Sequence, residues 1–161
     1  MSFICIVETS LSQTKTANDL ITSAYSKYGR NNYQGSINDY TKAIALSPNY
    51  AIAYIGRGLV RHKIKDYQGA IEDYTKAIEL NPKYPTTYSK RGLVNVDLKD
   101  YQAAISDYTK AIELKPKYAE AYKNRGLSYL GLEQKSNALA DFMKAKELGY
   151  TVPRKLLDMC K

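Results

Sequence analysis

Several residue types that mark common functional sites are scarce in this chain of 161 residues. It has one histidine, His62, and two cysteines, Cys5 and Cys160, which stand near opposite ends. The cysteines have neither the spacing of a zinc site nor the density of a disulfide scaffold. A single histidine nearly excludes the metal and nucleophile sites that need several ligands or a base. Because no phosphate-binding or acid–base motif is present either, we expect no enzymatic activity, no metal and no cofactor.

Long apolar runs are also lacking. No segment approaches the roughly 18 apolar residues that a membrane-spanning helix needs. Residues 1–8 (MSFICIVE) contain a short apolar run without the basic leader of a signal peptide. We therefore expect a cytoplasmic protein that has no membrane partner.

Tyrosine and positive charge are abundant instead: the chain has 16 Tyr, no Trp, 2 Phe and a net charge of +8. The tyrosines follow an internal repeat. The segment DYTKAI begins at Asp39, Asp73 and Asp107, in steps of 34 residues. Aligned without a gap, residues 51–84 and 85–118 share 22 identities in 34 positions. The chain is therefore a repeat protein.

Each repeat is predicted to contain two helices, because apolar residues recur at spacings of three and four. Asp66 and Asp100 are suited to cap second helices at their N-termini, and Pro116 follows the end of one. Alternation with period two is absent, so we expect no strands. The predicted organisation is a head (1–16), four repeats (17–50, 51–84, 85–118 and 119–150) and a short C-terminal capping helix (151–161), with Leu156 and Leu157 closing the core.

Small residues recur at equivalent positions in the predicted helices, as at Gly58, Gly92 and Gly126. Glycine inside a helix costs up to about 1 kcal/mol relative to alanine. Its repetition indicates close helix contacts that offset this cost. Since a single pair of helices cannot bury its own apolar face, neighbouring repeats must stack on it.

The pattern of aromatic, small and proline positions resembles the tetratricopeptide repeat (TPR) family over about residues 17–150. The matching residues are Tyr54, Gly58, Tyr67, Ala70, Tyr74, Ala77 and Pro82, and again Tyr88, Gly92, Tyr101, Ala104, Tyr108, Ala111 and Pro116. The resemblance implies an all-α, right-handed superhelical solenoid of antiparallel helix pairs. It also implies a protein–protein interaction scaffold, whose first helices line a concave groove for a peptide or a partner helix.

Charged residues recur on both predicted helices of the repeat. One set is expected to form structural ion pairs between packed helices; the alternative is a row of anion-binding groups. The sequence does not decide whether the pairs form within a repeat or between repeats. The residues are Arg57, Arg91, Arg125, Asp39, Asp73, Asp107 and Asp141.

The residues expected to bind a peptide lie on the predicted first helices and face the groove. The middle of this stripe, Leu59, Leu93 and Leu127, is apolar and expected to lie off the internal packing face. An exposed apolar stripe edged by lysines suits a partner that offers apolar and some acidic side chains. The candidates are Tyr25, Tyr28, Ile55, Leu59, His62, Lys63, Lys90, Leu93, Val96, Lys123, Asn124 and Leu127, flanked by Ile21, Thr86, Ser89, Asp97, Glu120 and Leu130.

One branch of the family binds the C-terminal carboxylate of heat-shock chaperones with Lys and Asn side chains from three successive first helices. We expect no such clamp here, because neither set of corresponding positions carries several suitable donors. These positions hold Ile21, Tyr25, Gly56, Thr86 and Lys90, or Ile55, Leu59, Lys90, Glu120 and Asn124.

Two other functions remain open alternatives: a basic nucleic-acid-associated protein, and a self-assembly module that stacks through its end repeats. Nucleic acid is the less favoured partner, because the basic residues are spread around the predicted rod. Residues 3–7 of the apolar head could pack over the first repeat, fill a groove, or join a second molecule into a homo-oligomer.

Overall fold

The computed structural model describes residues 16–161, in which α-helices are joined by short loops and no strand occurs. The expectations for residues 3–7 of the head lie outside the described residues. The helices are α1 (Ala17–Gly29), α2 (Tyr33–Leu46), α3 (Ala51–Lys63), α4 (Tyr67–Leu80), α5 (Pro85–Asp97), α6 (Tyr101–Leu114), α7 (Ala119–Gly131), α8 (Lys135–Glu147) and α9 (Arg154–Asp158).

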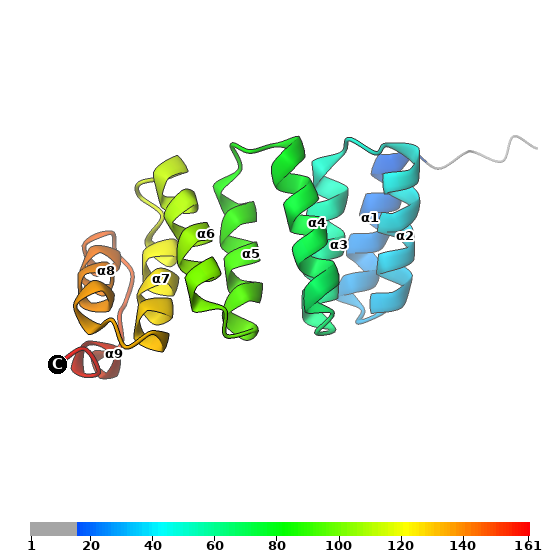
Figure 1. Ribbon diagram of the computed structural model, residues 1–161. Helices are drawn as coiled ribbons and strands as arrows, with labels where there is room; N and C mark the ends of the chain where they lie inside the picture. The colour runs from blue at the N-terminus through cyan, green and yellow to red at the C-terminus, as the bar shows by residue number, and fades with distance from the viewer. Residues whose placement is uncertain (1–15) are drawn as a thin grey trace, which may run out of the picture.

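Helices α1 to α8 form four antiparallel pairs that follow one another along the molecule (Figure 1). Helix α1 contacts α3, α3 contacts α5 and α5 contacts α7, whereas the even-numbered helices in residues 16–161 do not contact one another. The odd-numbered helices therefore form the inner layer of the curve. This arrangement is the predicted all-α, right-handed superhelical solenoid.

The helix boundaries follow from capping side chains and prolines. Asn32, Asp66 and Asp100 precede α2, α4 and α6, and the side chain of each accepts a hydrogen bond from a backbone N–H in the first turn. Each of these helices ends two residues before a proline. Pro85 occupies the first turn of α5, where its missing N–H leaves no hydrogen bond unmade.

A ring packed against glycine sets the spacing within each of the later helix pairs. A Cβ atom at Gly58 would lie 3.0 Å from the ring of Tyr74, and one at Gly92 would lie 3.1 Å from the ring of Tyr108. Both tyrosine side chains are fully buried. The repeated glycines therefore allow a close approach that a larger residue would prevent.

The short helix α9 continues the repeat register. Cys160 stands 34 residues after Gly126 and, at 8% exposure, is buried where the earlier repeats have their small residue. Leu156 and Leu157 pack on the last core cluster, which includes Phe142 and Cys160. The segment therefore covers the end of the solenoid as the start of another first helix would.

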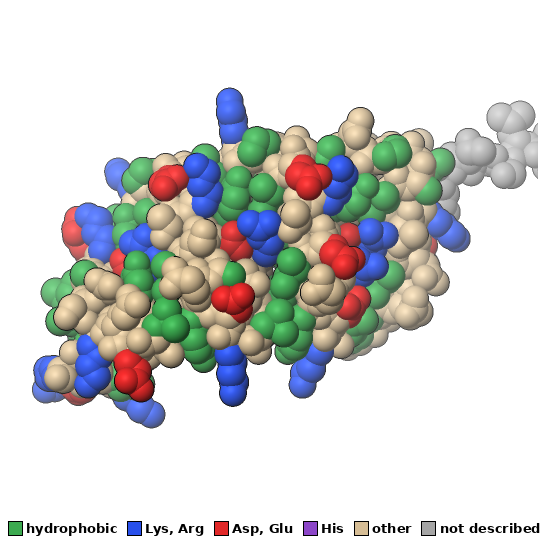
Figure 2. All heavy atoms as spheres, viewed as in Figure 1, with side chains coloured by type: hydrophobic (Ala, Val, Ile, Leu, Met, Phe, Trp, Pro, Cys, Tyr) green, Lys and Arg blue, Asp and Glu red, His purple; other side chains and the backbone are tan. Residues whose placement is uncertain are grey.

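Acidic and basic side chains lie next to one another on the face shown in Figure 2. Exposed Lys–Glu ion pairs recur on α4, α6 and α8. Their N···O distances are 3.1 Å for Lys76–Glu79, 2.9 Å for Lys110–Glu113 and 2.8 Å for Lys144–Glu147. Within residues 16–161, no helix has the length and apolar character needed to cross a membrane.

Candidate functional site

The repeated arginines bind the repeated aspartates across the second, third and fourth helix pairs. The shortest N···O distances are 2.7 Å for Arg57–Asp73 and Arg91–Asp107, and 2.8 Å for Arg125–Asp141. The aspartate side chains are at most 8% exposed, so these carboxylates are largely removed from water. In each pair, the arginine and the aspartate belong to the same repeat. The sequence alone did not decide whether the pairs form within a repeat or between repeats.

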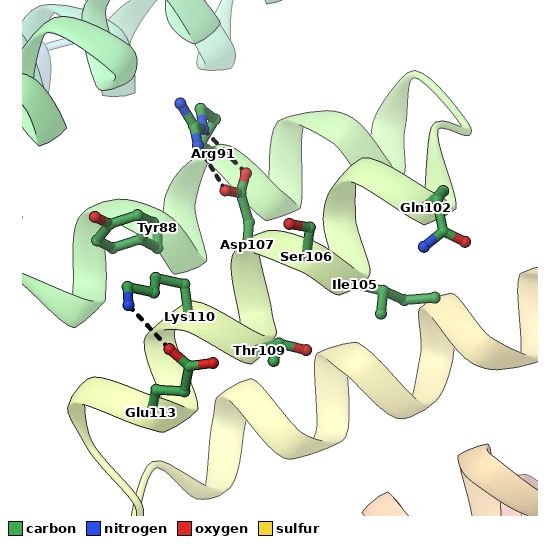
Figure 3. Close-up of a pocket in the computed structure, with 9 residues that line it drawn as sticks. All are labelled: Tyr88, Arg91, Gln102, Ile105, Ser106, Asp107, Thr109, Lys110 and Glu113. Atoms are coloured by element: carbon green, nitrogen blue, oxygen red, sulfur yellow. Dashed lines mark hydrogen bonds and ion pairs between the residues drawn. The ribbon is translucent and has the colours of Figure 1, made fainter.

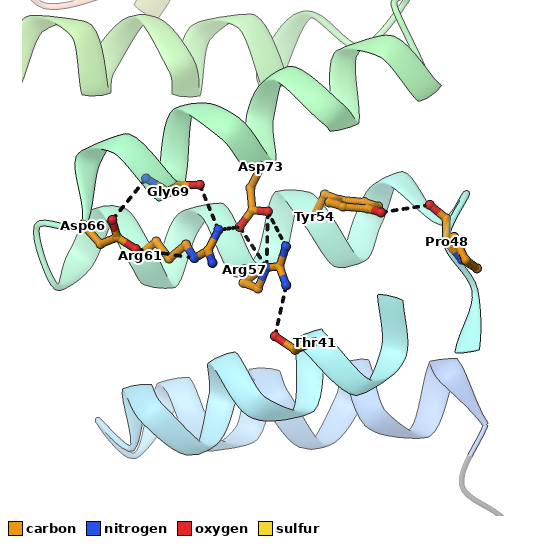
Figure 4. A network of polar contacts seen from close by, with 8 residues as sticks. All are labelled: Thr41, Pro48, Tyr54, Arg57, Arg61, Asp66, Gly69 and Asp73. Atoms are coloured by element: carbon orange, nitrogen blue, oxygen red, sulfur yellow. Dashed lines mark hydrogen bonds and ion pairs between the residues drawn. The ribbon is translucent and has the colours of Figure 1, made fainter. Parts of the chain in front are cut away.

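The same arginines also link each repeat to the one before it. Arg57 Nη1 donates to Thr41 Oγ1 at 3.0 Å, as Figure 4 shows. The equivalent bonds join Arg91 to Thr75 and Arg125 to Thr109, both at 2.9 Å. Each guanidinium therefore holds two second helices together. These threonines were not predicted to take part, although the segment DYTK places one at the same position in three repeats.

The first repeat replaces arginine with two smaller donors. Ser23 stands where the later repeats have arginine, and its hydroxyl donates to Asp39 at 2.6 Å. Lys27 makes an ion pair with the same carboxylate, also at 2.6 Å. Within residues 16–161, no helix precedes α1, so the link to a preceding second helix begins with the second repeat.

A cavity of about 600 Å³ lies beside this network on α5 and α6 (Figure 3). Its charged side chains are already paired, Arg91 with Asp107 and Lys110 with Glu113. Burial raises the pKa of the Asp107 carboxyl, against the opposing effect of its bonds to Arg91 and Asn95. These internal pairs give the cavity a structural explanation, so it is not our candidate ligand site.

The candidate site is a row of three hollows along the inner layer. The first has a volume of about 370 Å³ and lies between α1 and α3. Its walls include Tyr25, Ile55 and Leu59 from the predicted set, together with Ile21 and Ile52. Tyr25 is 69% exposed and Ile52 is 49% exposed, so much of this apolar surface faces solvent.

The second hollow, of about 240 Å³, is lined by residues of the first three repeats. Tyr28, His62 and Lys63 line it as predicted, and Asp97 closes it from α5. His62 Nε2 lies 2.6 Å from Asp97 Oδ2. The only histidine of the chain therefore contacts a neighbouring repeat and links α3 to α5.

The third hollow, of about 170 Å³, lies between α5 and α7 and is more polar. Lys90, Leu93 and Asn124 line it, with Thr86 and Glu120 at its edge. Leu93 is 42% exposed, whereas Asn124 is only 7% exposed. The character of the lining thus changes along the groove, from apolar in the first hollow to mixed and charged in the third.

Three residues of the predicted set lie outside these hollows. Val96 packs against the buried cluster that contains Tyr88 and Tyr108. Leu127 is half-buried against the last core cluster, so the expectation that it lies off the packing face is wrong. Leu93 at the equivalent position is 42% exposed, whereas the cluster against which Leu127 packs also includes Cys160 of the C-terminal segment. Lys123 lies over the ring of Tyr150, with its Nζ 5.5 Å from the ring centroid.

The first hollow also contains residues that the sequence analysis did not identify, above all Tyr40, Ile52 and Gly56. The repeat register could have found Ile52, which stands 34 residues before Thr86. Tyr40 reaches the hollow because its ring lies directly against Gly56, where a Cβ atom would collide with it. The equivalent positions in the next repeats hold Lys90 and Asn124, so this aromatic floor belongs to the first hollow.

Comparison with known proteins identifies the same repeat. Models described as tetratricopeptide repeat match residues 51–84 and 119–148, and a model described as TPR repeat matches residues 24–65 and 95–132. None of the curated proteins compared with the sequence matches it.

Solved structures have the same arrangement of helices. The crystal structure of MamA is 30% identical, with a TM-score of 0.79, over 83% of this chain and 78% of that one. The first TPR domain of Spaghetti (RPAP3), bound to the HSP90 peptide SRMEEVD, is 25% identical, with a TM-score of 0.71, over 73% of this chain and 94% of that one. A tetratricopeptide repeat protein from Parabacteroides merdae is 21% identical, with a TM-score of 0.82, over 89% of this chain and 58% of that one, and shows the fold alone.

Proposed function

Because the chain belongs to the tetratricopeptide repeat family, we propose that it is a protein–protein interaction scaffold that binds its partner in the concave groove. The partner is an extended peptide or a helix, and the chain acts as a scaffold rather than an enzyme. A structural neighbour that carries a bound peptide supports this function. The observation that carries the proposal is the row of three hollows along one layer of helices.

The lining of the hollows indicates the chemistry of the partner. Tyr25, Ile55 and Leu59 suit apolar or aromatic side chains at one end of a bound segment. Lys63 and Lys90 suit acidic side chains farther along the groove. This differs from a carboxylate clamp, because neither set of corresponding positions carries several side chains that could donate to a carboxylate. For a short peptide, a Kd in the micromolar range is expected, since ordering an extended chain opposes the contact energy.

Peptides selected from a displayed random library provide the test. The full chain is compared with a Leu59→Glu, Leu93→Glu double variant, which places two charges in the groove. We expect the Kd of the selected peptides to rise at least tenfold, as the loss of central apolar contacts at an interface commonly does.

The matched control is Leu46→Glu, because Leu46 is 59% exposed at the end of α2 and lines none of the three hollows. Circular dichroism confirms that each variant remains helical. Equal binding by the parent and the double variant would refute the groove as the binding site.

An exposed apolar face of α8, the last second helix, favours a second candidate function, self-assembly by stacking of end repeats. Leu139 is 38% exposed and Met143 is 51% exposed. At the equivalent positions of the preceding repeat, Ile105 is only 7% exposed and Thr109 binds Arg125 of the next repeat. A second molecule that packs here would extend the solenoid. Light scattering of the parent and of a Leu139→Glu, Met143→Glu double variant tests this. If the parent is an oligomer, the double variant should be a monomer. A double variant with the same mass as an oligomeric parent would count against stacking through α8.

Ion pairing weighs against the nucleic-acid alternative. Arg57, Arg91 and Arg125 bind aspartates, and the repeated lysines of α4, α6 and α8 bind glutamates. Much of the repeated positive charge is therefore locally compensated. A tight complex with RNA or DNA that weakens steeply as salt rises would favour that alternative instead.

A further inference from the structure

The first hollow presents an apolar surface at the start of the concave groove. Ile21, Tyr25, Ile52, Ile55 and Leu59 line it, and the two most exposed of them are Tyr25 and Ile52. Folded proteins seldom leave a contiguous surface of this kind uncovered unless something binds there. We therefore expect an apolar segment to bind to this surface.

Residues 3–7 of the same chain have the matching chemistry. Their sequence is Phe-Ile-Cys-Ile-Val, five apolar residues without a charge. Among the three hollows described, only the first lacks a charged side chain in its lining. Lys63 and Asp97 line the second, and Lys90 and Glu120 line the third. An uncharged apolar segment therefore fits the first hollow best.

The length of the intervening chain allows this contact. Residues 8–15 span up to about 26–29 Å when extended. They join α1 at Thr16, its N-cap, and Tyr25 lies about 13 Å farther along the same helix at 1.5 Å per residue. A tether of this length gives an effective concentration in the millimolar range. The segment of the same molecule thus has an advantage over a second copy in dilute solution.

We propose that residues 3–7 dock in the apolar hollow formed by α1 and α3 of their own chain. The docked segment covers Tyr25, Ile52 and Ile55 and occupies the apolar end of the groove. Docking itself does not depend on the proposed function. If that function holds, the segment also competes with a peptide partner and lowers its apparent affinity.

The native Cys5 lies at the centre of the segment and provides a direct test. Cys160→Ala removes the other native thiol, and Thr22→Cys then places a second thiol at the hollow. The matched control is Ser106→Cys, whose exposed position lies on α6, outside the three hollows. A disulfide requires the two Cα atoms to approach within about 7 Å, so its formation under mild oxidation reports proximity.

We expect Cys5 to form a disulfide within monomers at least about tenfold faster in the Thr22→Cys variant than in the Ser106→Cys variant, because docking concentrates one thiol beside the other. Part of this difference comes from the shorter chain between Cys5 and position 22, so the decisive comparison adds Ile52→Glu to the Thr22→Cys variant. This addition should slow disulfide formation several-fold, while circular dichroism shows unchanged helicity. An unchanged rate after adding Ile52→Glu, or equal rates for the two cysteine variants, would overturn the proposal. So would disulfide-linked dimers as the main product, because they would assign the hollow to a second copy. None of these outcomes depends on peptide binding, so this test can fail while the proposed function stands.

Discussion

A guanidinium held between two second helices gives the repeated arginine its structural role. Arg91 binds Asp107 in its own repeat and Thr75 in the repeat before. The sequence predicts the arginine and the aspartate as a pair, because both recur at a fixed spacing. It does not reveal the threonine, because a repeated hydroxyl is equally compatible with an exposed helix face.

The pairing direction predicts which second substitution rescues an arginine variant. Arg91→Leu leaves Asp107 buried without its guanidinium, and we expect a loss of about 3 kcal/mol in the free energy of unfolding. Adding Asp107→Asn removes the uncompensated charge and should recover much of this loss. Adding Asp73→Asn should deepen it, because Asp73 binds Arg57 and Arg61 instead. Urea unfolding of the two double variants measures the difference, and equal rescue by both would contradict the assignment.

Two buried tyrosines lead to a prediction about pH. The hydroxyls of Tyr74 and Tyr108 have no hydrogen-bond partner in the described part of the chain, and Phe142 stands at the equivalent position in the fourth repeat. Tyr74→Phe with Tyr108→Phe should therefore change stability by less than about 1 kcal/mol at pH 7.

At alkaline pH, the same double variant should be more stable than the parent. Burial raises the pKa of both hydroxyls above the ordinary value of 10. The unfolded chain then releases protons near pH 10 that the folded chain retains, so the contribution to stability is full below pH 10 and falls as pH rises further. Urea midpoints at pH 7 and 11 test both statements. A large loss at pH 7 would show that the hydroxyls make stabilising bonds.

At the scale of the helices, boundaries were more predictable than the turns between them. Asp66, Asp100 and the prolines fix where second helices begin and end, because capping and the missing N–H of proline are local effects. The sequence has no comparable local signal for the backbone conformation of the turns. Asn31, Lys65, Lys99 and Glu133 share a left-handed conformation at the same place in each repeat, although their side chains have little in common.

This conformation predicts a stabilising substitution. Lys99 has a φ of 62°, which is unfavourable for a residue with a Cβ atom. We expect Lys99→Gly to raise the free energy of unfolding by up to about 1 kcal/mol. Lys42→Gly is the control. Lys42 is an exposed residue inside α2, where the same change should lower the free energy of unfolding by about 1 kcal/mol. If both substitutions proved equally destabilising in urea unfolding, the strain at position 99 would be disproved.

At the scale of the whole molecule, the repeat acts as a unit that can be removed. Deleting residues 85–118 removes one complete repeat and joins equivalent positions of its neighbours. Arg125 binds Thr109, 16 residues before it, and in the shortened chain it would stand 16 residues after Thr75 instead. We expect a folded, helical protein with a lower Tm, because solenoid stability sums over neighbouring interfaces.

Deleting residues 101–117 instead removes one second helix and unpairs α5. That variant should lose cooperative thermal unfolding by circular dichroism. Cooperative melting of both deletions, or of neither, would contradict the repeat as the structural unit.

The architecture and most of the groove could be predicted because the 34-residue spacing assigns each side chain to a face. Local exceptions to the repeat could not be predicted in this way. Gly56 admits Tyr40 where the later repeats have Lys90 and Asn124, and this gives the first hollow its aromatic floor. Leu127 has the register of a groove residue, but it is half-buried against the last core cluster, on which the C-terminal segment also packs.

The central claim is that the layer of odd-numbered helices receives another protein's chain. Backbone amide chemical shifts of the ¹⁵N-labelled full chain, recorded as a library-selected peptide is added, test it most directly. We expect the largest changes on α1, α3, α5 and α7, around Tyr25, Leu59 and Leu93. Changes concentrated on α2, α4, α6 and α8 would place the partner on the opposite layer and contradict the account.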